Sequence, residues 1–564
     1  MGPAFERGGA ARCAPPLDNG QRKEDGLMRN SRVPRRRPTA LACIAIAAAA
    51  ISAANAAPVA AAQTDGEPGA TRQPTLVVLM AVDQLRHDML ERYDDLYSGG
   101  LRRLLDRGRV FTRATHDHAM TATAPGHTTL ATGVYPTRHG IVGNSWFEIR
   151  DGQRDNVYSM RDRDAPIVAF PDLEGRSPKN VTRDGIAQWI REAEPRARVV
   201  SVSRKDRAAI GLSARARGEV FWLIPQGGVF STSTFYHDTL PGWVQRFNAD
   251  DMPRLYADVE WESLVPPVLA GRSRPDTASA EGDGTHTYFT HRAADEARDT
   301  TEAALNLWRA GTPAPDRATL AFAERAVETL GLGQQGHLDF LAVSLSQTDI
   351  IGHGYGPFSR EQLDNLLRLD RELGAFFAFL DRTVGPDGWT LAFSADHGVL
   401  PVPEYLDPPG GRIGPAFGQR LGALVREVMA SGLEGDELAK ALAERLVADP
   451  DIEAAYTFAE LENEPADSFA VLYAHSHSRT RFTGQLGPLG VDLRLRPNLI
   501  GGPRGTTHGS PYLYDRWVPV IFYGPGVEPG RTDERVSTVD VAPTLAHLVG
   551  VPAPDDLDGR VIVH

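Results

Sequence analysis

Residues 76–83 read LVVLMAVD, a run of seven apolar residues that ends at the carboxylate of Asp83. Similar apolar runs lie at 199–202, 338–345, 389–393 and 518–523. Uninterrupted apolar strands of this length are typical of a sheet that is buried on both faces. Helical patterns alternate with the runs, the clearest beginning at Ser359 with Gln362 as its capping-box partner and another running from Asp540 to Val549. The alternation predicts an α/β fold with a largely parallel central sheet and helices on both faces.

Polar residues suited to chemistry follow these apolar runs. They are Asp83 after the first run, Lys205 and Arg207 after the second, Asp349 after the third, and Asp396 with His397 after the fourth. In a parallel sheet, ligands bind beyond the carboxyl ends of the strands. We therefore expect these side chains to meet at one edge of the sheet.

Several of these residues have the donor types of a metal site. Asp349 and His353 are four positions apart, Asp396 and His397 are adjacent and precede a glycine, and His508 lies on a loop flanked by glycine. A lone Asp-His pair is more often structural, and an aspartate after a strand is often a helix N-cap. The coincidence of five donors at strand ends favours metal binding. Mixed Asp and His ligation suits zinc and the two-metal sites of hydrolytic enzymes.

A threonine-rich segment completes the pattern. Residues 120–133 read MTATAPGHTTLATG and residues 139–144 read HGIVGN. Together with the ordered motifs VDQ, KDR, TDxxGH, ADHG and TTHGS, these segments resemble the alkaline phosphatase superfamily. The resemblance is to its bacterial threonine-nucleophile alkaline phosphatases, which are related to nucleotide pyrophosphatase/phosphodiesterases, and it covers about residues 75–560.

The resemblance implies an alkaline-phosphatase-like fold and a role for each site residue. Thr123 is the nucleophile and is activated by the first of two zinc ions. The ligands of that ion are Asp83, Thr123, Asp396 and His397, and those of the second are Asp349, His353 and His508. Asn144, Lys205 and Arg207 contact the phosphoryl oxygens. His127 and His139 each lie in a tight turn that contains glycine, and we expect them to fix these turns rather than to bind zinc.

The chemistry agrees with these roles. A threonine hydroxyl is a weak nucleophile at neutral pH, so it needs a base or a metal ion. Lys205 and Arg207 are two positions apart, and on an extension of the strand they would project from one face. A phosphate monoester is a dianion and gains from two added cations, whereas a diester carries one charge. In isolation, residues 204–207 would be interpreted as a solvated charged run.

The sequence thus predicts a zinc-dependent phosphatase of broad specificity that hydrolyses monoesters through a covalent phosphothreonine intermediate. The alternative on the same fold is a phosphodiesterase or nucleotide pyrophosphatase. A more remote alternative is a non-catalytic zinc-binding protein, which would give no reason for Thr123, Asn144, Lys205 and Arg207. A sulfatase needs a cysteine or serine where Thr123 stands.

The N-terminal region predicts export. Residues 29–37 contain five arginines, an apolar run follows, and Ala54-Asn55-Ala56 is a small-residue cleavage pattern. We interpret residues 1–62 as a signal peptide region whose true start can be Met28, and residues 63–74 as a flexible lead-in. Residues 75–564 form the predicted catalytic domain, with insertions at about 211–315 and 401–500. The predicted location is periplasmic or secreted.

Composition limits the partners of this 564-residue chain. The net charge is −13, so the basic footprint of a nucleic-acid-binding protein is missing. Both cysteines, Cys13 and Cys43, precede the predicted cleavage site. We expect small-molecule phosphate esters as substrates, no nucleic-acid partner, no membrane association after cleavage, and a monomer.

Overall fold

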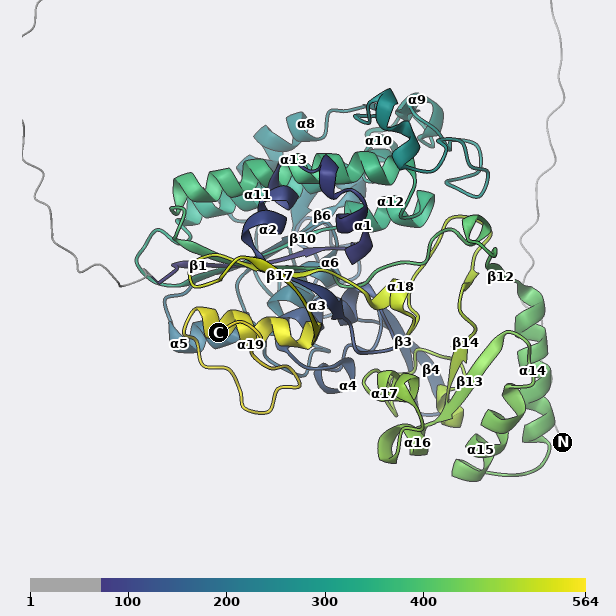
Figure 1. Ribbon diagram of the computed structural model, residues 1–564. Coiled ribbons are helices and arrows are strands. Elements are labelled where there is room, and N and C mark those ends of the chain that lie inside the picture. Colours follow the sequence, from purple (N-terminus) through teal and green to yellow (C-terminus); the bar gives the residue numbers. More distant parts are fainter. Residues whose placement is uncertain (1–72) are drawn as a thin grey trace, which may run out of the picture. The chain divides into compact units, whose positions relative to one another are not determined.

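A nine-stranded sheet forms the centre of the computed structural model, which describes residues 73–564 (Figure 1). The strand order is β17-β2-β16-β11-β1-β10-β5-β6-β7. The bounds are β1 Leu76–Val82, β2 Arg109–Thr115, β5 Val199–Ser203, β6 Glu219–Ile224, β7 Val229–Ser231, β10 Asp339–Leu345, β11 Trp389–Ser394, β16 Val520–Tyr523 and β17 Gly530–Ser537. β16 and β7 run antiparallel to their neighbours, and the other paired strands are parallel. The predicted largely parallel sheet is confirmed.

The central strand β1 is buried along its whole length, as its apolar sequence predicts. Val78 and Met80 join the hydrophobic core on one face of the sheet, and Val77 and Leu79 join the core on the other. Because β10 and β11 flank β1 in parallel, the carboxyl ends of all three strands lie at the same edge. The predicted signal region and most of the predicted lead-in lie outside the described residues.

Helices cover both faces of the sheet (Figure 1). Those packed on the first core are α1 His87–Arg92, α2 Gly100–Arg107, α11 Ala314–Leu330 and α13 Arg360–Thr383. Those packed on the second are α3 Thr123–Thr132, α5 Ile186–Ala193, α6 Asp206–Ser213 and α19 Val541–Leu548. Ser359 caps α13 by accepting from the backbone N–H of Gln362, at 3.0 Å. The Gln362 side chain donates to the Thr348 carbonyl and does not accept from the backbone N–H of Ser359, so half of the predicted capping box is formed.

The predicted insertion at 211–315 needs a correction. Its first part supplies β6 and β7, which extend the central sheet beside β5. The remaining elements lie outside that sheet and are α7 Gly242–Arg246, α8 Met252–Leu255, β8 Glu260–Trp261, β9 His291–Arg292, α9 Ala293–Glu296 and α10 Glu302–Arg309. β6 escaped the prediction because its apolar run is short and is followed at once by a Pro-Gln-Gly-Gly turn.

Residues 403–501, which we name the cap, contribute no strand to the central sheet. The cap elements are β12 Gly411–Ile413, α14 Pro415–Met429, α15 Gly435–Leu446, β13 Ile452–Thr457, α16 Phe458–Asn463, α17 Ser468–Ala474, β14 Val491–Leu495 and β15 Leu499–Gly501. β13 and β14 pair with each other, and a separate small apolar core lies between them and the cap helices. The predicted boundaries at 401 and 500 fall close to these limits.

The remaining elements connect the sheet to the site and are α4 Pro136–His139, β3 Ser145–Arg150, β4 Gln153–Tyr158, α12 Gln347–Tyr355 and α18 Leu513–Arg516. Within residues 73–564, none of the helices combines the length and the apolar character needed to cross a membrane.

Candidate metal centre and nucleophile

The predicted donors converge at the carboxyl edge of the sheet. Asp83 directly follows β1, Asp349 and His353 lie on α12 after β10, and Asp396 and His397 follow β11. His508 arrives from the loop between β15 and α18. Each of the seven predicted ligands except Thr123 belongs to a group of three donor residues whose ligand atoms lie within 4.8 Å of one another.

The first half-site is fully buried. Asp83, Asp396 and His397 are each 0% exposed. The Nε2 of His397 lies 3.5 Å from Oδ1 of Asp83 and 3.4 Å from Oδ2 of Asp396. These three atoms have no hydrogen-bond partner among the described residues. Buried polar atoms without partners cost free energy, so three that face one point fit a bound cation.

The second half-site is more open. The Nε2 of His353 is 3.1 Å from Oδ1 of Asp349, and the Nε2 of His508 is 3.7 Å from the same oxygen. The His353 side chain is 36% exposed, whereas that of Asp349 is 3% exposed. This half-site therefore faces the solvent side of the pocket, where a substrate can approach.

One hydrogen-bond pattern recurs at all three histidines. Nδ1 of His397 bonds the Gly398 carbonyl at 2.9 Å, Nδ1 of His353 bonds the Thr506 carbonyl at 2.9 Å, and Nδ1 of His508 bonds the Thr121 carbonyl at 2.7 Å. A carbonyl oxygen can only accept a hydrogen bond, so each Nδ1 carries the proton and each Nε2 keeps its free electron pair. This arrangement fixes the tautomer that a metal ligand needs.

The electrostatics of the two half-sites also favour a cation. Burial, together with the neighbouring Asp396 carboxylate, raises the pKa of Asp83 well above its usual range. Burial and the nearby His397 ring lower the pKa of His508 well below its usual range. A bound dication would favour the ionised form of Asp83 and would hold His508 neutral. The donor set therefore fits divalent metal ions.

Lys205 lies between the half-sites. Its Nζ is 2.6 Å from Oδ2 of Asp83 and 2.5 Å from Oδ2 of Asp349, and its side chain is 3% exposed. These contacts use the second oxygen of each carboxylate and leave both Oδ1 atoms turned toward the histidines. The ammonium group thus connects one carboxylate of each half-site.

Thr123 is the first residue of α3 and is 1% exposed. Among residues 73–564, its hydroxyl has one side-chain hydrogen bond, from Nη2 of Arg207 at 3.5 Å. No histidine or lysine base contacts this hydroxyl in the described chain. The N-terminus of α3 carries the positive end of the helix dipole, which favours an anion beside Thr123.

The expectation that Lys205 and Arg207 lie on a strand extension is wrong. Lys205 is the N-cap of α6, and Arg207 lies in the first turn of that helix. Both still face the site because α6 packs closely against α3. Asn144 also lies beside Thr123, since its Oδ1 accepts from the backbone N–H of Ala124 at 2.8 Å. This contact leaves the Asn144 amide hydrogens free to donate.

Sequence reasoning assigned no role to Gln84 or Tyr158. Gln84 donates from Nε2 to Asp349 at 2.7 Å and from its backbone N–H to Asp396 at 3.0 Å. The Tyr158 hydroxyl donates to Asp206 at 2.5 Å, beside Arg207. His127 contacts the Thr123 carbonyl and the Ser344 hydroxyl, and its Nδ1 also lies 3.1 Å from Oδ2 of Asp396. It therefore shares a candidate donor group with Asp83 and Asp396, and its structural role stays a prediction. Only the position of Gln84 next to Asp83 gave a signal in the sequence.

Comparisons with known proteins agree with this architecture. Residues 77–461 match the family model described as type I phosphodiesterase / nucleotide pyrophosphatase. The chain is 32% identical to alkaline phosphatase PhoV of Synechococcus elongatus, over 93% of this chain and 98% of that protein. It is 32% identical to alkaline phosphatase PhoK of Sphingomonas sp., over 87% of this chain and 91% of that protein.

A solved structure shares the fold over most of the chain. The crystal structure of alkaline phosphatase PafA is 28% identical, covers 88% of this chain and 99% of its own, and superposes with a TM-score of 0.77. A second structure of PafA carries substitutions at a threonine, an asparagine, a lysine and an arginine.

Proposed function

Because the chain belongs to the type I phosphodiesterase / nucleotide pyrophosphatase family, within the alkaline phosphatase superfamily, we propose that it is a phosphoric monoester hydrolase that uses Thr123 as its nucleophile. The observation that carries this proposal is the position of Thr123. Its hydroxyl lies at the start of α3, with Arg207 beside it and clustered metal-donor residues at the adjacent strand ends.

The proposed reaction has two chemical steps. Thr123 Oγ attacks phosphorus and loses its proton, the bond from phosphorus to the leaving oxygen breaks, and a phosphothreonine forms. Water then attacks that phosphorus, inorganic phosphate leaves, and the threonine hydroxyl is restored. Two zinc ions, held by Asp83, Asp396 and His397 and by Asp349, His353 and His508, would supply charge neutralisation and activation of the attacking oxygens.

Three side chains position the phosphoryl group. Arg207 reaches the nucleophile oxygen, so its guanidinium is placed for a phosphoryl oxygen bound there. The Asn144 amide is oriented by its bond to Ala124 and donates to a second oxygen. Lys205 adds a further positive charge between the carboxylates. The four residue types Thr123, Asn144, Lys205 and Arg207 occur in the same order as those substituted in the PafA variant.

The charge balance favours monoesters. A monoester dianion meets two cations and an amide in addition to the metal ions, and positioning with charge neutralisation provides most of the rate in phosphoryl transfer. A diester presents one charge fewer and needs space for a second substituent. The relatives named alkaline phosphatases support this choice, while the name of the family model keeps the diesterase as the competing outcome.

We further propose that the enzyme is exported and works as a monomer. The signal-like order of residues 29–62 supports export to the periplasm or beyond, where phosphate esters are scavenged. The acidic charge of the chain argues against nucleic acid as a partner.

A comparison of two substrates tests the proposal. The purified chain is assayed with p-nitrophenyl phosphate and bis-p-nitrophenyl phosphate at alkaline pH. We expect kcat/KM to be at least 100-fold higher for the monoester, on the order of the stabilisation that two added charged contacts provide. In the variants Lys205→Ala and Arg207→Ala, this preference should shrink. A wild-type enzyme that prefers the diester would overturn the proposal.

A further inference from the structure

The cap covers a large apolar cavity beside the second half-site. Its volume is about 610 Å³, and its wall includes Leu421 and Val425 of α14 together with Leu486, Leu489 and Val491. Met120 and Gly509 form the side nearest the site. Met120 lies three residues before Thr123, and Gly509 directly follows His508. The cavity therefore adjoins both the nucleophile segment and a predicted metal ligand.

A smaller cavity adjoins this space. Its volume is about 230 Å³, and His508 itself forms part of its wall. Tyr473, Leu493 and Gly509 line both cavities, so the two spaces are neighbours along one path. Gly509 has φ +107°, a conformation that other residues rarely adopt, and it lets the chain turn sharply after His508.

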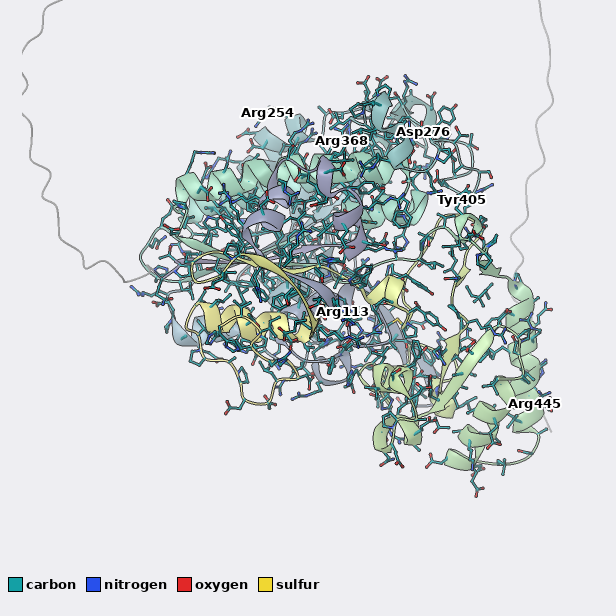
Figure 2. The ribbon with its side chains drawn as sticks, viewed as in Figure 1. Arg113, Arg254, Asp276, Arg368, Tyr405 and Arg445 are labelled. Atoms are coloured by element: carbon teal, nitrogen blue, oxygen red, sulfur yellow. The ribbon has the colours of Figure 1, made fainter. Side chains whose placement is uncertain are left out.

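The cap is anchored where this path begins. The backbone N–H of Ala119 donates to the Leu472 carbonyl at 3.0 Å and to the Ser476 hydroxyl at 2.8 Å. These bonds hold the end of α17 against the segment that leads to Thr123. Figure 2 shows the cap with Arg445 on α15 and with Tyr405 close to the point where the chain enters the cap. The anchor fixes the cavity relative to the nucleophile.

One charged group lines the larger cavity. Asp492, on β14, has no cation within 4.0 Å and no side-chain hydrogen bond among the described residues. Burial raises the pKa of Asp492 to about 7, so the group is ionised at alkaline pH. An unpaired carboxylate in an apolar cavity repels a ligand that carries its own negative charge there.

From this geometry we propose that the cavity under the cap binds the leaving group of the substrate, and that it selects phosphate monoesters whose leaving group is apolar, ring-bearing and uncharged. The inference rests on the proposed function and takes the second half-site, to which His508 belongs, as the side from which the leaving group departs. A leaving group that extends past Gly509 contacts the apolar wall of the cavity. Each ring that is removed from water there contributes favourable binding free energy.

The test compares phenyl phosphate with biphenyl-4-yl phosphate, whose second ring reaches further without a large change in leaving-group chemistry. We expect the wild-type kcat/KM to be about tenfold higher for the biphenyl ester. Gly418→Phe fills the cavity, because a Cβ at Gly418 on α14 meets no heavy atom within 4 Å. This variant should lose the tenfold preference and keep the rate on phenyl phosphate. Ala423→Phe, on the same helix but outside the cavity wall, is the matched control and should keep both.

A binding measurement separates this inference from the proposed function. In calorimetry, biphenyl-4-ol, the free leaving group, should bind the wild-type chain and the Ala423→Phe control with similar affinity. Its affinity for Gly418→Phe should be at least tenfold lower. A biphenyl ester with a carboxylate on its second ring should react about tenfold more slowly than the neutral ester, and Asp492→Asn should reduce this difference. Equal kcat/KM for phenyl and biphenyl esters, or equal affinity of wild type and Gly418→Phe for the alcohol, would overturn the inference. Hydrolysis of phenyl phosphate would still stand.

Discussion

The site floor, which comprises Asp83, Thr123, Asp349, Asp396 and His397, and the cap over it are packed in opposite ways. The floor residues are all between 0% and 2% exposed. They lie on the segments that follow the buried strands of the central sheet and at the start of α3. Val428 is the one buried residue of the cap helix α14, whereas α13, which packs on one face of the sheet, has thirteen buried residues. Donor atoms that share an ion must be held rigidly, while a surface that accepts different leaving groups needs unfilled space. The predicted reacting groups thus lie in the floor, whereas the proposed selectivity for the leaving group resides in the cap.

The largest effect is expected at the nucleophile. Thr123→Ala removes the attacking oxygen, so kcat/KM for p-nitrophenyl phosphate should fall by at least about 10³-fold. Metal content should stay close to that of the wild type, because the other six predicted ligands remain. Steady-state kinetics and elemental analysis on the same sample check both statements. A variant with full turnover would show that Thr123 is not the nucleophile.

The same substitution at two carboxylates, one in the floor and one in the cap, compares these two regions directly. Asp349→Asn weakens a predicted ligand and one partner of Lys205, and we expect a loss of about 10²-fold or more in kcat/KM for p-nitrophenyl phosphate. Asp492→Asn changes a buried cap carboxylate by the same chemical step and should alter the rate on this small substrate less than about twofold. Similar losses in both variants would contradict the separation of chemistry from selectivity.

A smaller effect is expected at the support of Arg207. Tyr158→Phe removes the hydrogen bond to Asp206, the neighbour of Arg207 at the start of α6. The guanidinium should then be held less firmly, and kcat should drop about 3- to 10-fold with little change in KM, a cost typical of one hydrogen bond. Tyr456→Phe in the cap removes the hydroxyl that contacts Asp467 and serves as the control. Equal kcat values for Tyr158→Phe and the wild type would show that the hydrogen bond from Tyr158 to Asp206 does not support Arg207.

The smallest effect concerns stability in acid. Burial lowers the pKa of His139 to about 3, and its Nδ1 accepts from the backbone N–H of Ile141. Between the unfolded pKa near 6.5 and pH 3, the unfolded chain binds a proton that the folded chain does not, so the free energy of unfolding falls as the pH falls.

His139→Asn should remove this contribution, at most about 1.4 kcal/mol per pH unit in that window. Urea unfolding at several pH values measures the slope, and His547→Gln at an exposed position is the control. A His139→Asn variant with the wild-type slope would contradict the assignment.

The sequence predicted the central sheet and the positions of the donors because both depend on local patterns. β1 is apolar throughout, β10 and β11 are mostly apolar, and polar residues follow each strand, so their common location at one sheet edge followed from the α/β rule. The antiparallel direction of β16 could not be inferred, since an apolar run has no signal for direction. β6 and β7 were hidden within a segment rich in turn residues.

Contacts between distant residues were beyond sequence reasoning. The bridge from Lys205 to Asp83 and Asp349 joins residues more than 120 positions apart, and the support of Asp349 by Gln84 spans 265 positions. The same limit applies to the cavity under the cap, whose wall combines α14, β14 and the segment before Thr123. Such features depend on tertiary packing rather than on periodicity.

The central claim, that two zinc ions lie beside Thr123, is tested most directly by anomalous diffraction at the zinc edge on crystals of the protein as purified. We expect two peaks, one among Asp83, Asp396 and His397 and the other among Asp349, His353 and His508. Crystals with no peak at these residues, or with zinc bound elsewhere in the chain, would contradict it.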